Sequence, residues 1–408
     1  MVLNPLRFIQ ATLLFVPTTF VVPNVGLVAF ALFSIIVYQP SFHRTDRLFF
    51  AFAIAVFANA VLGIAIEQNF PESIFVNNGL VGAIILLLAY LSAQTLSDTT
   101  LKLLLLFVIF EAIVLIFQVA LGVRYFFESQ AMYLPTNVEF QPGQNIGDMD
   151  LLYFVRPMGL SQSSSIVASK IFLGLLLTYL VPMRRTFKLA IMAFLFAALI
   201  TSFRRSNIAS AAIFFVILVL LDIRNNGWRF RHSLLAGALI ASATLYTTAI
   251  LVQLTRNFAS TINEINIDLL ILQLSGRAEI WQETVEFISH HLFFGNFSTR
   301  YQISTGHYPH SSYFSLLSTH GLFVSVLAMS FIIRKLRAKP QCFVLMVPLL
   351  FNSIFSDDLF WYISVFDIFV LYLLTQAQPS AAWGFSFRPS VRFSLLPQPP
   401  KTIPDTAS

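Results

Sequence analysis

The chain has 408 residues, of which 57% are hydrophobic and only 11% are charged, whereas about 25% of the residues of a soluble domain are charged. Together with a mean hydropathy of +0.77, this composition excludes a cytosolic enzyme, a disulfide-rich scaffold, a disordered protein and a β-barrel porin. It predicts an all-α polytopic integral membrane protein. The net charge of +6 is explained by Lys and Arg in cytoplasmic loops, and we expect no nucleic-acid partner. The single Cys342 excludes an internal disulfide and a cysteine metal cluster.

Twelve apolar windows follow one another along the chain, and a membrane-spanning helix takes about 20 residues. We therefore expect about 12 transmembrane helices, with a short first pair. The first window lacks a small-x-small cleavage site and runs into the second, so we interpret it as a retained span and not as a signal peptide. The windows cover residues 8–22, 25–39, 48–66, 79–96, 103–122, 164–182, 187–203, 207–222, 233–254, 312–333, 341–355 and 359–376.

The distribution of basic residues predicts the orientation of these helices. If the N-terminus lies inside and the windows alternate, most of the 25 Lys and Arg residues fall in the cytoplasmic linkers and tail, as the positive-inside rule requires. Both termini then face the cytoplasm, and Lys170 falls inside a window. The outer side holds the seven residues Arg124, Arg156, Arg204, Arg205, Arg256, Arg277 and Arg300.

Two connections are long, and both fall on the outer side. They cover residues 123–163 and 255–311, and the second is a large loop between the ninth and tenth helices. Long loops are uncommon in the absence of a function. We expect a single membrane domain over residues 1–376, followed by a Pro- and Ser-rich cytoplasmic tail over 377–408 that is disordered.

The outer arginines are the residues that the positive-inside rule does not explain. A guanidinium group presents a planar set of donors that binds phosphate oxygens bidentately, and it keeps its charge. Arginines gathered on the outer face therefore predict an anionic ligand at the membrane surface. For any single arginine, a contact with lipid head groups or with an outer carboxylate is the stronger alternative, so local patterns must select among them.

Residues 275–289 predict an amphipathic outer helix with Ser275 as its N-cap. Arg277 lies in the first turn, where a cation is mildly unfavourable for the helix itself. This position favours a role for Arg277 toward a ligand or partner. The predicted apolar face consists of Trp281, Val285 and Ile288.

Three further patterns lie at the outer ends of predicted spans. Residues 201–206, Thr-Ser-Phe-Arg-Arg-Ser, form a tight turn that holds the adjacent Arg204 and Arg205. The run Arg156-Pro-Met-Gly159 closes the first long loop. Residues 306–313, Gly-His-Tyr-Pro-His-Ser-Ser-Tyr, lead into a span and place His310 at its outer mouth.

In this order the patterns resemble those of the O-antigen ligase and O-antigen polymerase superfamily of bacterial membrane glycosyltransferases. Ser275-Gly-Arg277, with Ile280-Trp281 and then His290-His-Leu and Gly295, resembles the family's "GR…W…hPl.G". The run from His310-Ser-Ser-Tyr313 to Gly321-Leu322 resembles its "HN.YL…lGl", Thr201-Ser-Phe-Arg204 resembles its "T.SR.", and Arg156-Pro-Met-Gly159 resembles its "R..G". The resemblance covers roughly residues 150–360 by motif and the whole chain by its pattern of spans.

The chain departs from the family pattern at three positions. Ser311 stands where Asn is usual, Phe203 replaces a Ser before the first arginine of the turn, and Arg205 replaces a Gly after it. Because Ser311 lies beside His310, its presence affects the fine geometry of the expected site. The set of arginines and histidine is retained.

The resemblance implies a GT-C-like glycosyltransferase of the bacterial inner membrane that moves a glycan from an undecaprenyl-diphosphate carrier to an acceptor hydroxyl. The reaction takes place on the periplasmic face, and the acceptor is lipid A–core or a second lipid-linked glycan. Arg204 and Arg277 would bind the departing diphosphate, so neither a metal nor another cofactor is expected. Arg205 and Arg156 are further phosphate contacts. A neutral imidazole can take the acceptor proton or position the hydroxyl, and the resemblance gives this role to His310.

Other assignments within the late loop stay open. His307 is the alternative to His310, and Glu279 is an alternative base or acceptor contact. A zinc site among the histidines of this loop is the weaker interpretation, because adjacent histidines do not form the i, i+4 pair that a helical metal site needs. The other outer carboxylates, which we expect to orient arginines or to be solvated, are Glu264, Asp268 and Glu283.

Glu111, Lys170 and Asp367 are charged residues that fall well inside predicted spans. Intramembrane charges usually have a function. We interpret these three as polar contacts between helices or as positions near the end of a span.

A transporter or flippase is the rival from another class. Transporters bind substrate near the membrane midplane, often on broken helices in two related halves, whereas here midplane charges are few and no halves repeat. A structural assembly subunit is a third possibility. Within the superfamily, a length near 400, a basic pI and one dominant late loop slightly favour a ligase over a capsule or exopolysaccharide polymerase.

Overall fold

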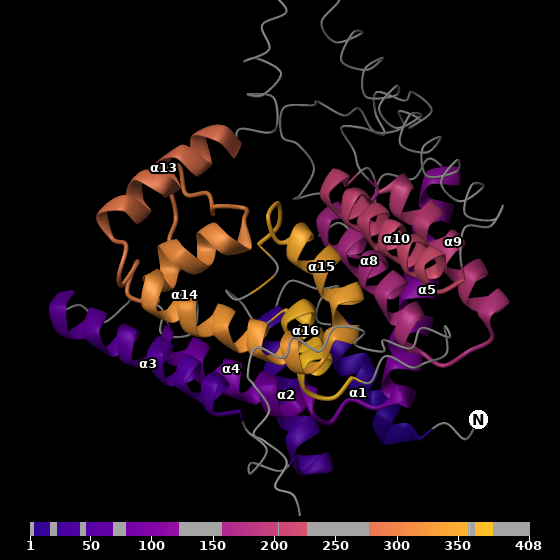
Figure 1. Cartoon of the computed structure of the whole chain (residues 1–408), viewed down its shortest axis with the longest axis horizontal. Helices are drawn as coiled ribbons and strands as arrows, with labels where there is room; N and C mark the ends of the chain where they lie inside the picture. Colours follow the sequence, from indigo (N-terminus) through magenta and orange to yellow (C-terminus); the bar gives the residue numbers. More distant parts are fainter. Residues whose placement is uncertain are drawn as a thin grey trace, which may run out of the picture.

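A computed structural model of the chain describes residues 4–16, 23–40, 46–67, 79–121, 157–202, 204–226, 277–357, 359 and 364–377. All regular structure in these segments is helical, and no strand occurs among them (Figure 1). The helices are α1 (Pro5–Phe15), α2 (Pro23–Tyr38), α3 (Arg47–Glu67), α4 (Gly79–Ala93), α5 (Asp98–Ala120), α8 (Ser164–Leu180), α9 (Arg185–Thr201), α10 (Arg205–Asn226), α13 (Arg277–His290), α14 (Ser312–Ala338), the 3-10 helix η3 (Pro340–Cys342), α15 (Phe343–Asn352) and α16 (Val365–Thr375).

Four of these helices, α3, α5, α10 and α14, are long and apolar enough to cross a membrane. Shorter apolar helices accompany them, among them α4, α8 and α16. The chain is therefore a helical membrane protein, as its composition predicts, while the number of 12 spans stays a prediction. The predicted span 233–254 and the tail from residue 378 lie outside the described residues.

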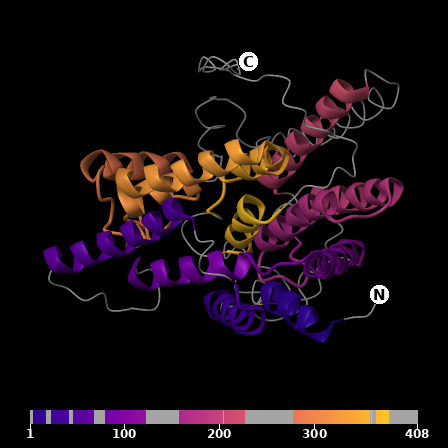
Figure 2. The same cartoon turned by 60° about the horizontal axis from the view of Figure 1, so that its bottom comes forward.

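The helices pack in two groups (Figures 1 and 2). In one group, α8 packs against α5, α9 and α10. In the other, α4 packs against α2, α3 and α16, and α14 packs against α3, α13 and α16. Two helices connect the groups, because α1 contacts both α2 and α5, and α15 contacts α10 and, through η3, α14.

Contacts near the helix termini gather at the two ends of the bundle. We name these ends inner and outer, after the membrane orientation that the distribution of basic residues predicts. At the inner end, Lys335 forms an ion pair of 2.9 Å with Asp46, and Lys339 Nζ donates a hydrogen bond of 2.7 Å to the Thr375 carbonyl. Burial raises the pKa of Asp46, but the hydrogen bonds from Lys335 and the Leu48 N–H, together with the charges of Lys335 and Arg334, leave the pKa below its usual range. These contacts join linkers that the alternation of helices places on the same side.

Residues 157–163, which we call the first inserted turn, reach into the bundle beside α5. Gln118 Oε1 accepts hydrogen bonds from the N–H groups of Met158 and Gly159 at 2.9 and 2.7 Å. Ser161 lies deeper, beside Glu111, which is more than two helical turns from the end of α5. The turn therefore lies within the helical layer, where its backbone groups need protein partners.

The charges Glu111 and Lys170 belong to one buried cluster under this turn. Lys170 Nζ donates to Ser161 Oγ at 3.0 Å, and Ser161 Oγ donates to Glu111 Oε1 at 2.7 Å. All three side chains are buried, so the predicted polar contact between helices is confirmed. Asp367 instead forms a capping box with Ser364 at the start of α16, which confirms a position near a helix end.

Helix α14 is broken at Gly321, which has a φ of 75°. The predicted span 312–333 lies within a helix long enough to cross a membrane, but the kink at Gly321 was not predicted. A side chain at this position would overlap the carbonyl group of Phe293, so the break exists where another segment of backbone comes too close for any residue with a Cβ atom.

That segment is residues 291–298, which we call the second inserted turn. It supplies partners for backbone groups that the break leaves without a partner in the helix. The bonds run from Asn296 N–H to Ser318 O (2.7 Å), from Ser298 N–H to Thr319 O (2.8 Å) and from Leu322 N–H to Leu292 O (2.8 Å). The turn and the break therefore depend on each other.

Asn59 of α3 fixes the second inserted turn from the opposite side. Its Nδ2 lies 2.9 Å from the carbonyl of Phe294, 3.0 Å from Ser298 Oγ and 3.2 Å from the carbonyl of His320. The ring of His320 lies 3.0 Å from the same Ser298 hydroxyl. Asn59, Ser298 and His320 are all buried, and together they form a polar cluster between two helices and the turn.

Candidate functional site

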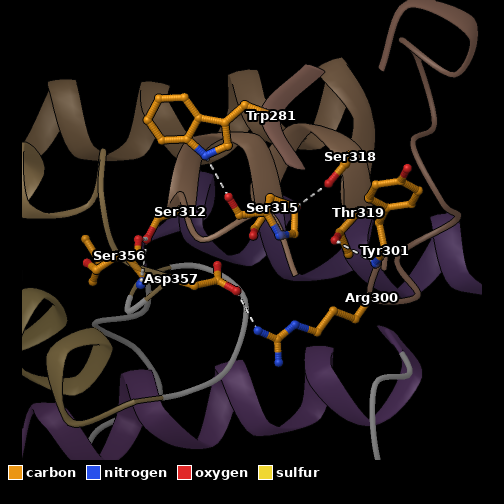
Figure 3. A network of polar contacts seen from close by, with 11 residues as sticks. Trp281, Arg300, Tyr301, Ser312, Ser315, Ser318, Thr319, Ser356 and Asp357 are labelled. Carbon is orange, nitrogen blue, oxygen red and sulfur yellow. Dashed lines mark hydrogen bonds and ion pairs between the residues drawn. The ribbon is translucent and has the colours of Figure 1, made fainter. Parts of the chain in front are cut away.

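The part of α14 before its break carries a series of buried hydroxyl groups at the outer end (Figure 3). They belong to Ser312, Ser315, Ser318 and Thr319. Ser312 connects the start of the helix to the turn after α15, because its N–H lies 2.9 Å from the carbonyls of both Ser353 and Ser356. Its hydroxyl also donates to the Ser356 carbonyl at 2.7 Å. The start of α14 is thereby fixed on residues 353–357, which we call the α15 turn.

Helix α13 packs at the same place through Trp281 (Figure 3). The indole N–H donates to the Pro309 carbonyl at 2.9 Å. The indole ring lies 5.6 Å from the ring of Phe314 in α14 and 6.3 Å from the ring of Phe355 in the α15 turn. The first turn of α13 is therefore held beside both the start of α14 and the α15 turn.

The buried face of α13 differs in part from the predicted one. Val285 is 50% exposed, whereas Ile280 is buried. Ile280 packs with Tyr301 and Ile303, so the helix covers a neighbouring loop as well as α14. Its buried face is therefore rotated about the helix axis relative to the predicted one. The predicted N-cap at Ser275 lies outside the described residues.

Arg300 and Asp357 form an ion pair that the sequence analysis did not single out. Arg300 Nη2 lies 2.5 Å from Asp357 Oδ2, and the two side chains are only 10% and 11% exposed (Figure 3). The guanidinium also lies 3.2 Å from the centre of the Tyr308 ring. These contacts hold the loop before α14 on the α15 turn. The sequence feature that could have indicated this ion pair is the polar stretch 356–358, which separates two apolar windows.

Glu283 has a structural contact in place of an arginine partner. Its carboxylate accepts hydrogen bonds from the N–H of Ser304 at 2.5 Å and from the Ser304 hydroxyl at 2.9 Å. Burial raises the pKa of the nearby Tyr301, and the charges of Glu283 and Glu286 raise it further. The shift favours the protonated form of the Tyr301 phenol.

Arg204 and Arg205 lie at the start of α10. The N–H of Arg204 donates to Ser202 Oγ at 3.4 Å, and α10 begins at the next residue. Helix α10 packs on α15, and Ser210 Oγ lies 3.5 Å from Asn352 Oδ1 at the end of α15. The two arginines therefore lie at the same end of the bundle as the α15 turn.

His310 is exposed and lies two residues before α14. Its φ of 52° is uncommon for a residue other than glycine, and such conformations concentrate at functional sites. The alternative His307 is also exposed, and its carbonyl accepts the N–H of Ile303 at 3.0 Å. Glu279 is exposed on the first turn of α13.

The structure brings three of the predicted segments together around the α15 turn. These are the start of α10 with Arg204 and Arg205, the start of α13, and the start of α14 with His310. Arg277 is the first residue of α13, but its side chain is outside the described part of the chain, as is the whole of Arg156. The roles of these residues stay predictions.

The described residues contain no group of three or more His, Cys, Asp or Glu side chains that could hold a metal ion. Neither models of known protein families nor curated protein sequences give a match to this chain.

Proposed function

We propose that this protein is a glycosyltransferase of the bacterial inner membrane that transfers an undecaprenyl-diphosphate-linked glycan to an acceptor hydroxyl, as O-antigen ligases do. The observation that carries the proposal is the convergence of the starts of α10, α13 and α14 around the α15 turn. Arg204 and Arg205, Arg277 and His310 lie on these three segments. In the proposed orientation both termini are cytoplasmic and this site faces the periplasm.

The departing group explains why arginines would be needed. Breaking the bond from the anomeric carbon to the carrier oxygen leaves a lipid diphosphate, and its negative charge must be stabilised as it develops. Arg204 and Arg277 would bind its oxygens, with Arg205 and Arg156 as further contacts. Arg205 and Arg277 both begin a helix, where the exposed N–H groups also favour an anion while a cation does nothing for the helix itself.

The acceptor hydroxyl loses its proton as its oxygen attacks the anomeric carbon. In the proposed reaction the His310 imidazole takes this proton, the new bond to oxygen forms, and the electrons of the broken bond leave with the diphosphate. Arg300, paired with Asp357 and stacked on Tyr308, would hold the loop that presents His310. Neither a metal nor a cofactor takes part in this scheme.

The test measures glycan transfer in proteoliposomes that contain a lipid-linked glycan donor and an acceptor glycolipid. We expect Arg204→Gln, Arg277→Gln and His310→Ala each to lower the transfer rate about 100-fold or more, which is typical for the loss of a group that stabilises a transition state. His290→Ala, at the exposed end of α13, is the matched control and should transfer normally. Near-normal transfer by Arg277→Gln or His310→Ala would refute the site, and inhibition by EDTA would refute the metal-free reaction.

A polymerase of O-antigen, capsule or exopolysaccharide is the second candidate, because it would use the same donor and the same phosphate contacts. The two differ only in the acceptor, which is lipid A–core for a ligase and a second lipid-linked glycan for a polymerase. A deletion strain distinguishes them on a glycolipid gel. Loss of long chains from lipid A–core with accumulation of lipid-linked chains indicates a ligase, and single-repeat products indicate a polymerase.

The break in α14 is the one observation that favours a transporter or flippase, since broken helices often carry transporter sites. In such sites the unwound backbone groups bind the substrate. Here the carbonyls of Ser318, Thr319 and His320 accept hydrogen bonds from the second inserted turn and from Asn59. We therefore assign the break a structural role. Labelling of substituted cysteines that alternated between the two sides of the membrane would contradict this assignment.

A further inference from the structure

The inner end of the bundle holds a pocket of about 390 Å³ that the proposed reaction does not use. It lies where the starts of α1 and α5 meet the ends of α2, α4 and α16. A volume of this size is sufficient for a small ligand or a head group. The lining residues are Arg7, Tyr38, Pro40, Gln94, Thr95, Leu96, Ser97 and Gln376.

Arg7 enters this pocket with its charge uncompensated. Its Nη1 donates to Gln10 Oε1 at 2.9 Å and to the Thr95 carbonyl at 2.7 Å. Its guanidinium lies 3.6 Å from the centre of the Tyr38 ring. All three partners are neutral, and in the described part of the chain no carboxylate pairs with Arg7. A partly buried cation without a counter-ion is unfavourable, so the arrangement favours an anion in the adjoining space.

Two further groups in the pocket wall lack a hydrogen-bond partner. The Tyr38 hydroxyl and Gln94 Nε2 are both buried, and within the described structure neither forms a hydrogen bond. Buried donors are nearly always satisfied in folded proteins. Both groups can donate, and their residues line the pocket that Arg7 enters.

The start of α5 adds to this preference. Ser97 lines the pocket and is the N-cap of α5, and the N-terminus of a helix favours negative charge. Asp98 follows directly, but its side chain is exposed and is not part of the pocket wall. The pocket therefore presents a guanidinium group, an amide, a phenol and a helix N-terminus around one space.

We infer that this pocket binds the phosphate group of an anionic ligand at the inner membrane surface. Phosphate oxygens accept hydrogen bonds from guanidinium, amide and hydroxyl groups together. Two sources offer this chemistry, namely the head group of an anionic phospholipid and a free phosphate ion. Basic residues near the inner surface, such as Lys335 and Lys339, would raise the local concentration of either.

The experiment uses the full-length protein in neutral detergent and phosphate-free buffer, and it measures the thermal unfolding midpoint. One arm adds phosphatidylglycerol, one adds phosphatidylcholine, and one adds inorganic phosphate. We expect phosphatidylglycerol to raise the midpoint more than phosphatidylcholine does, since a ligand stabilises the state that binds it. An equal rise with inorganic phosphate alone would identify free phosphate as the source. If none of the three raised the midpoint, the inference would be overturned.

Single substitutions test whether the lipid-dependent rise in the unfolding midpoint arises from binding in this pocket. Tyr38→Phe and Gln94→Ala remove the two donors without partners, so they should keep the midpoint of the lipid-free protein while weakening the response to phosphatidylglycerol. Arg7→Gln should lower the affinity about 10-fold or more, as the loss of a charged hydrogen bond does. Arg184→Gln is the matched control, because it removes an exposed arginine from the same end. A response lost equally in Arg184→Gln would overturn the inference.

Discussion

Both inserted turns are held inside the helical layer, but the contacts that hold them differ. The first inserted turn rests on side chains, namely Gln118 and the charged Glu111 and Lys170, which reach it while α5 and α8 stay continuous. The second rests on the neutral Asn59 and on backbone groups that become accessible only because α14 opens at Gly321. Side chains can extend to a turn from an unbroken helix, whereas the backbone groups of a helix become available to a turn only where the helix itself breaks. The first turn should therefore be sensitive to charge and the second to backbone geometry.

Gly321→Ala should produce the largest effect. The new Cβ atom would overlap the Phe293 carbonyl and would hold Ala at a positive φ, so we expect the free energy of unfolding in mixed micelles to fall by about 4 kcal/mol or more. Gly82→Ala is the matched control, because no atom lies within 4 Å of its would-be Cβ atom and Ala favours a helix. A loss below about 1 kcal/mol at Gly321 would show that the break is not required.

Lys170→Met should come next and should affect the first inserted turn. Removing one member of a buried charged pair leaves the other uncompensated, and we expect a loss of about 3 kcal/mol in the free energy of unfolding. The double variant with Glu111→Gln should recover most of this loss, because it removes both charges. The measurement is a double-mutant cycle of unfolding free energies, and simple additivity of the two single variants would contradict charge coupling between Glu111 and Lys170.

Many of the helices could be predicted from the sequence, because long runs of apolar residues directly indicate membrane helices. Helix α8 begins at Ser164 and ends at Leu180, close to its predicted window, and Asp367 lies near a helix end as expected. The break in α14 could not be predicted, because a single glycine in an apolar helix is compatible with a continuous span. It depends on residues 291–298, whose position is a matter of tertiary contact.

The candidate site shows the same limit. Short motifs selected Arg204 and His310 as candidates, and their segments lie at one end of the bundle. The Arg300–Asp357 pair joins residues 57 positions apart, and nothing in the local sequence of either residue names the other. Long-range pairs of this kind are fixed by tertiary packing. Sequence patterns therefore indicate candidate site residues better than they indicate the residues that hold the site in place.

Asn59→Ala tests the second inserted turn through its side-chain contact. Asn59 Nδ2 lies within hydrogen-bond distance of three acceptors, two of which are backbone carbonyls. We expect the free energy of unfolding to fall by about 2 kcal/mol, because buried acceptors lose their donor. Val61→Ala on the same helix is the control, since Val61 is 44% exposed and should matter little. If Asn59→Ala were as mild as Val61→Ala, the turn would be held by its backbone bonds alone.

The smallest effects come from the serine of each cluster, and they compare the two turns most directly. Ser161 and Ser298 are both fully buried, so Ser161→Ala and Ser298→Ala remove the same atom from the same degree of burial. Ser161 bonds to a carboxylate and an ammonium group, and its loss should cost about 1.5 kcal/mol, whereas Ser298 bonds to the Asn59 amide and the His320 ring, and its loss should cost about 0.6 kcal/mol. Parallel unfolding measurements give the difference. A cost for Ser298→Ala that equals or exceeds that for Ser161→Ala would mean that charge is not what distinguishes the two turns.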